Sequence, residues 1–367
     1  MENNQNETVK AEKKENKFLA FLKKLFAGKK KERVSADAGE KNNWKAWLYL
    51  APTLILMAVF TFYPLINTIV IAFLKNYNYI DNSSQGFTLD NFGVVLGLVG
   101  KNGAGETIYR WQCTSVNGTR GIYIDAGGLP RDAYFTIDVI KYAFPNTLII
   151  TFVTVPASII IALLISVGLN SIKWFKKLLQ TIFFVPYVTN GIAVGMVFAV
   201  LFDYKGIINY IFHLGNFPWF DQGAPRWAAM IALCVYIVWH SLPYKILIFL
   251  SGLQNIDKQY YDAAKIDCAG KFKTLMNVTV PLLSPQILYI MITSFIGSFK
   301  EYSSVVGLLG RSGTSEGVNN MYTVVYYIYD MIKGNVQYGA AAAVLLFILI
   351  MIFTAIQFRV SKARVHY

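Results

Sequence analysis

Residues 253–285, LQNIDKQYYDAAKIDCAGKFKTLMNVTVPLLSP, form a polar, charged segment between two strongly apolar runs near the C-terminal end of the chain. Within it, residues 260–269 predict a short helix, and the small side chains of Ala263 and Ala264 permit a neighbouring backbone to approach closely. Three aspartates supply charge for a partner: Asp257, Asp262 and Asp267. The segment therefore predicts an exposed element that meets another molecule.

The second half of this segment predicts a turn and a sharp end. Gly270 allows the chain to turn, and residues 271–280 resume a helical composition. Pro281 and Pro285 then stop regular backbone hydrogen bonding just before the next apolar run, because proline has no N–H to donate. The two halves together predict a rigid helix–turn–helix at a membrane surface.

The whole chain has the composition of a membrane protein. Of its 367 residues, 55% are hydrophobic and only 15% are charged, and the mean hydropathy is +0.42. A helix of roughly 20 apolar residues crosses about 30 Å of hydrocarbon. Six runs without Lys, Arg, Asp or Glu approach or exceed this length: residues 46–74, 142–172, 178–202, 227–244, 274–299 and 334–358. The sequence therefore predicts an all-α polytopic membrane protein with six transmembrane helices.

The positions of the 34 lysines and arginines predict the orientation, because cytoplasmic loops carry an excess of positive charge. Twenty-two of them lie in the two terminal tails and in the loops after the second and fourth spans. The loops on the opposite side hold ten, six of them in one long loop. Both termini and residues 253–285 are therefore expected in the cytoplasm. The formal net charge of +13 is attributed to orientation and anionic lipid, and no nucleic-acid partner is expected.

Residues 253–285 resemble the cytoplasmic coupling loop of ABC importer permeases of the carbohydrate, maltose-permease-like type. That pattern has Glu-Ala-Ala, then three residues and a glycine, followed by a phenylalanine and two spaced prolines. The matching positions are held by Asp262, Ala263, Ala264, Asp267, Phe272, Pro281 and Pro285. Asp262 replaces the usual glutamate, and Cys268 stands where the pattern has glycine. Cys268 thereby removes a permissive backbone position, because residues other than glycine are disfavoured at positive φ.

The resemblance extends over residues 46–362, with further landmarks at Ala51-Pro52, Phe62-Tyr63-Pro64 and residues 87–92. It implies a subunit of a binding-protein-dependent importer in the bacterial cytoplasmic membrane that translocates sugars, with oligosaccharides as the expected class. In this family the coupling loop docks on an ATPase, so Asp262 is expected to meet a basic residue there, with Cys268 and Gly270 in the turn behind it.

The same resemblance implies a set of partners: a second permease subunit in a heterodimer, a cytoplasmic ABC ATPase dimer, an extracellular solute-binding lipoprotein, the sugar and membrane lipid. ATP and Mg²⁺ belong to the ATPase. This chain is expected to bind no cofactor and to be no enzyme, because it lacks a Gly-x-x-x-x-Gly-Lys-Ser/Thr phosphate loop and a Gly-x-Ser-x-Gly elbow.

The sequence divides into five predicted parts. They are a basic, largely disordered cytoplasmic tail with a possible amphipathic helix at 17–27 (1–43), the first transmembrane helix (44–74), a long extracellular loop with an inserted element at 101–135 (75–141), a permease core with the other five helices (142–362) and a short cytoplasmic tail (363–367). Alternation around Tyr109 and Ile122 predicts a small β element in the insertion. It is expected either to contact the binding protein or to cap the transporter.

The scattered cysteines and histidines exclude other classes of site. Cys113, Cys234 and Cys268 are expected on different sides of the membrane or within it, so no internal disulfide is predicted. With only three histidines and no spacing typical of metal ligands, no metal site is predicted either.

Charged and aromatic residues within the apolar runs are candidates for a translocation pathway. Lys300, Glu301 and Tyr302 follow a short apolar stretch, and charges at such depth are costly and usually face a polar interior. The alternative is an interfacial pair whose charged ends reach the water. Trp239 and His240 are weaker candidates, since a ring stacks on a sugar face but most intramembrane tryptophans only pack or anchor.

Three alternatives stay open: two other classes of membrane protein and a permease with a different cargo. An ion-coupled secondary transporter would need substrate and ion sites near the membrane midplane, usually between repeated halves, and no repeat is visible. A membrane scaffold for a partner enzyme would need no pathway. A permease for a non-sugar solute such as a glycerophosphate would share the coupling loop.

Overall fold

The computed structural model describes residues 44–117, 119–125, 128–136, 138–172, 178, 181–182, 185, 187–220, 224–310 and 321–361. The predicted tails, 1–43 with its possible helix at 17–27 and 363–367, lie outside these residues. The backbone divides into two compact units, Met1–Val59 and Phe60–Tyr367. Each unit is described by itself.

The first apolar run is helical from Trp47 to Ala72. It comprises α2 (Trp44–Met57), a π-helical turn (Ala58–Phe62) and α3 (Tyr63–Ala72), with Pro64 in the first turn of α3, where its missing N–H leaves no helical bond unmade. Every described side chain of α2 from Trp47 onward is at least partly exposed, and in α3 burial begins only at Ile71. Within the second unit, most of the apolar surface of α3 is therefore exposed.

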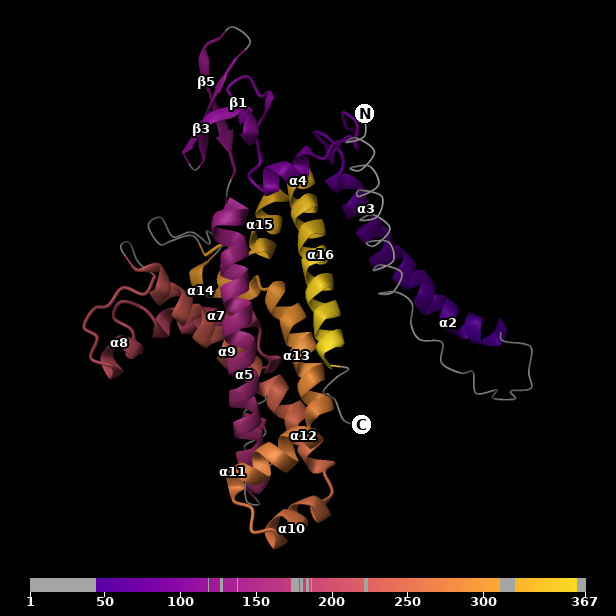
Figure 1. Cartoon of the computed structure of the whole chain (residues 1–367), viewed down its shortest axis with the longest axis vertical. Coiled ribbons are helices and arrows are strands. Elements are labelled where there is room, and N and C mark those ends of the chain that lie inside the picture. The colour runs from indigo at the N-terminus through magenta and orange to yellow at the C-terminus, as the bar shows by residue number, and fades with distance from the viewer. Residues whose placement is uncertain are drawn as a thin grey trace, which may run out of the picture. The chain divides into compact units, whose positions relative to one another are not determined.

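The segment after the first span contains a β-sheet, so the all-α prediction is wrong here. Helix α4 (Asp90–Val95) leads into five strands: β1 (Val99–Asn102), β2 (Thr107–Tyr109), β3 (Cys113–Asn117), β4 (Arg120–Ile124) and β5 (Pro130–Phe135). They form an antiparallel sheet in the order β2-β1-β5-β4-β3, drawn in purple in Figure 1. Ile108, Tyr123, Ala133 and Phe135 form its small core. Buried side chains alternate with exposed ones along β4, so one face of the sheet supplies this core. The two edge strands, β2 and β3, are short.

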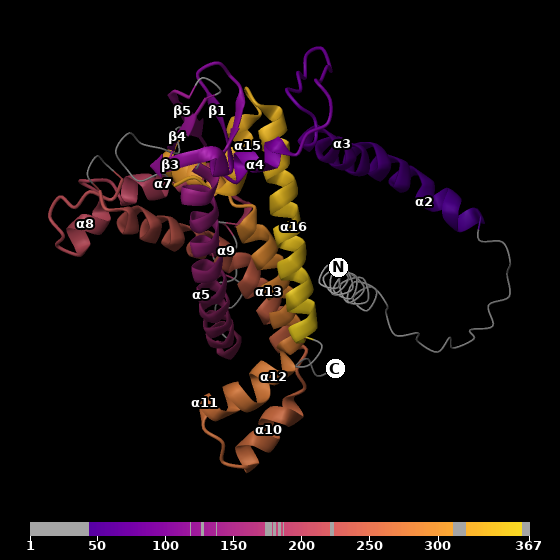
Figure 2. The same cartoon turned by 45° about the horizontal axis from the view of Figure 1, so that its top comes forward.

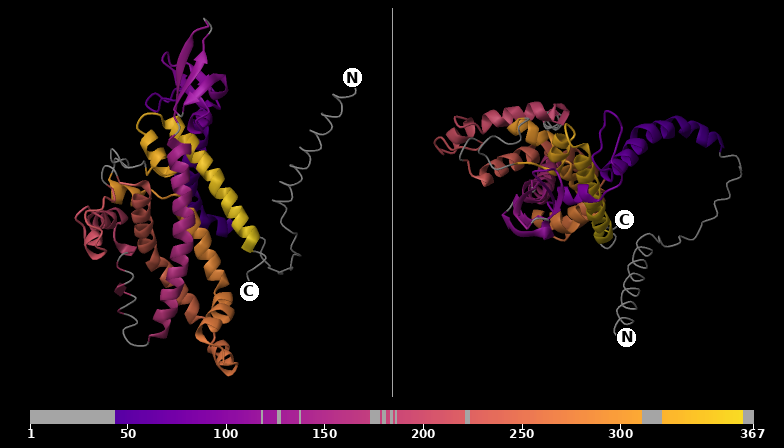
Figure 3. Two further views of the ribbon diagram at one scale, coloured as in Figure 1. Left: turned by 60° about the vertical axis from the view of Figure 1, so that its left-hand side comes forward. Right: turned by 90° about the horizontal axis from the view of Figure 1, so that it is seen from above.

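Three long apolar helices form the body of the second unit. They are α5 (Phe144–Ser171), which follows a π-helical turn (Val139–Ala143), α9 (Arg226–Gln254) and α16 (Val336–Ser361). Figures 1 and 3 show them running lengthwise with α13 (Ser284–Phe299). A buried core joins α5, α9 and α13 through Ala162, Leu169, Ile246, Phe249, Leu250 and Ile290. These helices position the cavity described below.

The predicted count of six transmembrane helices is not confirmed. Among the described residues, four helices are long and apolar enough to cross a membrane, and a bent pair brings the number to at most five. The predicted span 178–202 is represented by α7 (Gly191–Leu201), which has only 11 residues, while most of residues 173–186 lie outside the description. The predicted span 274–299 is broken at Leu283 by a 71° bend.

Short helices complete this unit. They are α8 (Ile207–Ile211), α14 (Ser303–Leu309) and α15 (Val324–Met331). Helix α14 crosses α7 so closely that a Cβ atom added at Gly195 would lie 2.7 Å from the backbone of Gly307. Glycine at both positions therefore allows the two backbones to touch.

Candidate functional site

The coupling loop, residues 253–285, projects from the end of α9 as a helical hairpin (Figure 2). Its first arm is α10 (Lys258–Ile266), and the second consists of α11 (Lys271–Thr274), a π-helical turn (Leu275–Thr279) and α12 (Val280–Leu282). A carboxylate oxygen of Asp257 accepts a hydrogen bond from the N–H of Gln259 at 3.1 Å and caps α10. Asp257 is therefore the N-cap residue of α10, a role that its expected use as a charge for a partner did not include.

The turn between the arms places Cys268 in the left-handed region, with φ of 51°. The N–H of Ala269 donates to the carbonyl of Ala264 at 2.9 Å, and that of Cys268 to Lys265 at 3.0 Å, which closes the end of α10. Gly270 has φ of −65°, a value that any residue adopts. The permissive position is therefore that of Cys268, as the comparison with the glycine of the pattern predicts.

The outer surface of the hairpin, on α10 and α11, combines charge with exposed apolar side chains. Asp262 pairs with Lys265 one turn away, Oδ1 to Nζ 2.8 Å, and this hydrogen bond holds the pKa of the Asp262 carboxyl below its usual value. Ile266 is 82% exposed and Phe272 is 75% exposed. An apolar surface of this kind beside a fixed carboxylate is typical of a protein–protein contact.

The two alanines of the motif face different ways. Ala263 is exposed, whereas Ala264 is buried within the chain. Asp267, also exposed, ends α10. Close approach by a partner therefore depends on Ala263, and Ala264 instead allows the two arms of the hairpin to pack.

Pro281 and Pro285 flank the bend at Leu283. Each lies in the first turn of a helix, α12 and α13 respectively. Leu283 itself is fully buried in the core shared by α5 and α9. The hairpin is thus joined to α13 through a bend that is held by packing.

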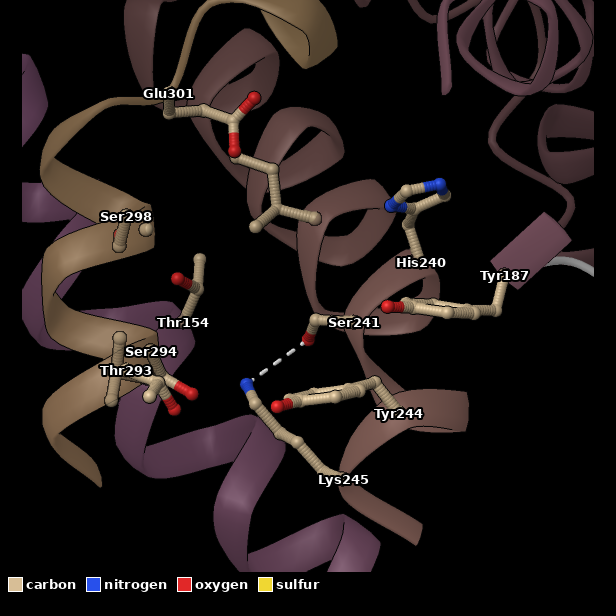
Figure 4. Close-up of a pocket in the computed structure, with 13 residues that line it drawn as sticks. Thr154, Tyr187, His240, Ser241, Tyr244, Lys245, Thr293, Ser294, Ser298 and Glu301 are labelled. Carbon is tan, nitrogen blue, oxygen red and sulfur yellow. Dashed lines mark hydrogen bonds between the residues drawn. The ribbon is translucent and has the colours of Figure 1, made fainter. Parts of the chain in front are cut away.

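A second candidate region is the central cavity, which has a volume of about 270 Å³. It is lined by Thr154 and Val155 of α5, Ile237, His240, Ser241, Tyr244 and Lys245 of α9, Thr293, Ser294, Gly297 and Ser298 of α13, and by Tyr187 and Glu301. Figure 4 shows these side chains around one open space between the helices. Their hydroxyl groups outnumber their charges, which suits a ligand rich in hydroxyls.

Polar atoms of this cavity are left without partners inside the protein. Within the described residues, the Nε2 atom of His240 and the Oγ atom of Ser298 are buried and have no hydrogen-bond partner. Buried polar groups are nearly always bonded, so these two atoms are available to a ligand or a water molecule in the cavity. His240, predicted from the sequence, is therefore placed in a position to contact a ligand.

Glu301 also lines the cavity, but the other three predicted pathway residues do not. Lys300 is exposed. Trp239 packs against Phe198, with 5.2 Å between ring centroids. Tyr302 stacks on Tyr329 at 4.3 Å. These three side chains therefore do not line this cavity together with His240 and Glu301. Trp239 and His240 are neighbours on α9, where successive side chains point about 100° apart.

Sequence reasoning missed the cavity residues Lys245 and Tyr244. Lys245 is 4% exposed, and its Nζ atom donates to the Oγ atoms of Ser158 and Ser241, the latter at 3.2 Å. Tyr244 stacks on Tyr187 with 5.7 Å between ring centroids. The signal in the sequence was a single lysine within the apolar helix α9. The structure shows that this lysine lines the cavity.

The sheet lies at the opposite end of the long helices from the hairpin (Figure 1). An exposed aromatic pair lies at β2 and the turn that follows it. Trp111, 73% exposed, stacks on Tyr109 at 4.5 Å. The hydroxyl of Tyr109 donates to Asp90 at 2.9 Å, and the nearby carboxylate raises the pKa of Tyr109. The pair is thereby fixed to α4 and presents a rigid surface.

Residues 154–367 match the family of the binding-protein-dependent transport system inner membrane component. The chain belongs to this family. The match begins at Thr154, so it includes α9, the coupling loop and every residue that lines the cavity. The carbohydrate-type permease family predicted from the coupling loop is confirmed, and the chain is a multi-pass membrane protein.

Several relatives are similar over most of the chain. A probable ABC transporter permease of Mycoplasma genitalium is 26% identical, with 83% of this chain and 82% of the relative covered. The lactose transport system permease protein LacF of Rhizobium radiobacter is 26% identical, with 87% and 94% covered. The arabinooligosaccharides transport system permease protein AraP of Bacillus subtilis is 31% identical, with 59% and 70% covered.

Solved structures share the fold. A bacterial ABC transporter involved in the import of the acidic polysaccharide alginate contains a chain with a TM-score of 0.66 and 15% identity, with 88% of this chain and 96% of that one covered. A chain of the bacterial alginate transporter in complex with an alginate pentasaccharide-bound periplasmic protein has a TM-score of 0.63 and 17% sequence identity, with 88% of this chain and 95% of that one covered.

Proposed function

We propose that the chain is a permease subunit of a bacterial ABC importer that translocates sugars, oligosaccharides among them, with ATP hydrolysed by a separate subunit. The family match and relatives whose names give lactose and arabinooligosaccharides as cargo support this function. The single observation that carries it is the coupling loop, an exposed hairpin with a fixed carboxylate and two exposed apolar side chains. A membrane protein that functions without a motor subunit has no need of this surface.

The hairpin is connected to the cavity through α13. Its second arm bends by 71° into α13, and α13 supplies Thr293, Ser294 and Ser298 to the cavity wall. A displacement of the hairpin by a closing ATPase pair therefore moves one wall of the cavity relative to α5 and α9. Such coupling requires two states of the bundle that the nucleotide-bound motor stabilises unequally.

The cavity is proposed to be the part of the translocation pathway that this subunit contributes. His240 and Ser298 offer unpaired polar atoms, and the stacked rings of Tyr187 and Tyr244 offer an apolar face for a sugar ring. Glu301 lies at the outer end of α13. These residues replace Trp239, Lys300 and Tyr302 as the groups that face the cargo.

A second permease subunit is proposed to cover the first span in a heterodimer. In α3, within the second unit, most apolar side chains are exposed, and burial begins only at Ile71. Lipid covers the part that the second subunit leaves open. Both termini and the coupling loop are proposed to lie in the cytoplasm, and the excess of lysine and arginine in these segments supports this orientation.

The sheet between Val99 and Phe135 is proposed to face outward and to contact a solute-binding lipoprotein. The rigid Tyr109–Trp111 pair and the exposed Tyr134 provide aromatic surface of the kind that is enriched at protein interfaces. ATP and Mg²⁺ bind to the ATPase subunits, and the chain itself contributes no catalytic residue.

The test is uptake by the complete transporter reconstituted in vesicles with its binding protein. Sugar uptake should require ATP on the side of the coupling loop and should persist when ion gradients are collapsed. Uptake by this chain alone, driven by an ion gradient and independent of ATP, would contradict the proposal and support a secondary carrier.

A further inference from the structure

The central cavity contains a buried lysine whose observed partners are all uncharged. Lys245 is 4% exposed, and Nζ donates to the hydroxyl oxygens of Ser158 on α5 and Ser241 on α9. Among the described residues it forms no ion pair. Figure 4 shows the ammonium group pointing into the open space, opposite Thr293 and Ser294 of α13.

A charge in this position is expensive to keep without a function. Placing a lysine at the centre of a transmembrane helix costs about 2.5–3.5 kcal/mol on insertion scales, and such residues usually mark a substrate or ion pathway. Two hydroxyl groups solvate an ammonium but do not neutralise it. Within the described residues, the third N–H of Lys245 has no acceptor, and the side chain lines the cavity.

Glu301 does not serve as the counter-charge in this structure. Its carboxylate accepts a hydrogen bond from the N–H of Ser304 at 3.0 Å, at the start of α14. In Figure 4 Glu301 lies at the far end of the cavity from Lys245. The two charges therefore mark opposite ends of the space, and the end at Lys245 is positive.

We propose that Lys245 binds an acidic group on the cargo, so that the transported sugar carries a carboxylate, a phosphate or a sulfate. The inference rests on the proposed function and specifies its substrate class. An anion beside Lys245 gains a charge-assisted hydrogen bond, about twice as strong as a neutral one, while the sugar ring packs on the wall formed by Tyr187 and Tyr244. Hydroxyls of the same ring meet Ser298 and His240.

The experiment uses the complete transporter in vesicles and paired cargoes that differ only in the acidic group: a uronic acid sugar, a sugar phosphate and a sulfated sugar, each with its neutral counterpart. ATP-driven uptake is measured for the native chain, Lys245→Gln, Lys245→Arg and the matched control Lys300→Gln. Lys300 is suitable because it is exposed and lies outside the cavity lining.

The native chain is expected to import at least one acidic member with a higher kcat/KM than its neutral counterpart. Lys245→Gln should lower kcat/KM for that acidic sugar by roughly 10- to 100-fold, the range of one hydrogen bond to a charged group, and should change it little for the neutral one. Lys245→Arg should retain most of the preference, and Lys300→Gln all of it. The acidic group that shows the effect identifies the source of the negative charge.

Equal loss for both members of every pair would overturn the inference and assign Lys245 a purely structural role. If Lys245→Gln fails to assemble, the native chain still decides, since equal or better uptake of the neutral members contradicts the inference. Failure to import any sugar with ATP would instead contradict the proposed function.

Discussion

The coupling loop and the central cavity contrast in how they use charge. In the loop, Lys265 pairs with Asp262 on an exposed helix surface. In the cavity, Lys245 is buried and bonded to hydroxyl groups alone. The first lysine is screened by water and contributes little to stability, whereas the second must be solvated by the protein or its cargo. Exposed charge thus suits contact with a partner protein, and buried charge suits selection of a ligand.

The largest expected effect comes from reversing the charge at the tip of the loop. Asp262→Lys should abolish sugar uptake, because it places a third cation near Lys258 and Lys265 and repels a basic site on the ATPase. The protein should still reach the membrane, since Asp262 is exposed and contributes no core packing. Uptake and membrane content are measured together.

The matched control is Asp81→Lys, an exposed aspartate in the segment between the first span and the sheet. It should leave uptake near the native level. Normal uptake by Asp262→Lys would show that this carboxylate has no part in docking.

Removing one partner from each lysine tests the contrast directly. Ser158→Ala should lower the free energy of unfolding by about 1–3 kcal/mol, the cost of leaving a buried polar group unsatisfied. Asp262→Ala, which removes the partner of Lys265, should change it much less, because an ion pair between exposed side chains contributes little to stability. Thermal unfolding of the purified subunit in detergent compares the two variants. Equal losses of stability would contradict the distinction between a buried and an exposed lysine.

The smallest expected effect concerns the turn of the hairpin. Cys268→Gly should raise the free energy of unfolding of the hairpin by about 1 kcal/mol, because the left-handed conformation costs other residues roughly 1–2 kcal/mol. Cys268→Val should lower it, since a branched side chain fits this conformation worse. Hydrogen exchange of the α10 amides measures both, and faster exchange in Cys268→Gly than in the native chain would contradict the interpretation of the turn.

The loop could be predicted from the sequence because its signals are local. Cys268, in the place of glycine, determines the turn, and Pro281 and Pro285 determine where the hairpin ends. Each of these residues acts on the backbone within a few positions of itself. Cys268 at positive φ follows directly from that comparison. The two prolines mark the place of the bend at Leu283, but its angle depends on burial against α5 and α9, which the sequence does not show.

The cavity could not be assembled from the sequence in the same way. Its walls come from α5, α9 and α13, which are far apart along the chain. Trp239 and His240 are adjacent in the sequence but face Phe198 and the cavity respectively. Lys245 interrupts the apolar sequence of α9, a signal that sequence reasoning did not use, and the sequence alone does not show the hydroxyl groups around it.

The contact between the coupling loop and a motor subunit is tested most directly by photo-crosslinking. A photoreactive residue is placed at Ile266, which is 82% exposed, and as a control at Ile80, which is 75% exposed and lies before the sheet. In membranes that contain the assembled transporter, position 266 should form an adduct with the ATP-hydrolysing subunit, and position 80 should not. Failure of position 266 to reach any nucleotide-hydrolysing subunit in an assembled transporter would contradict the account.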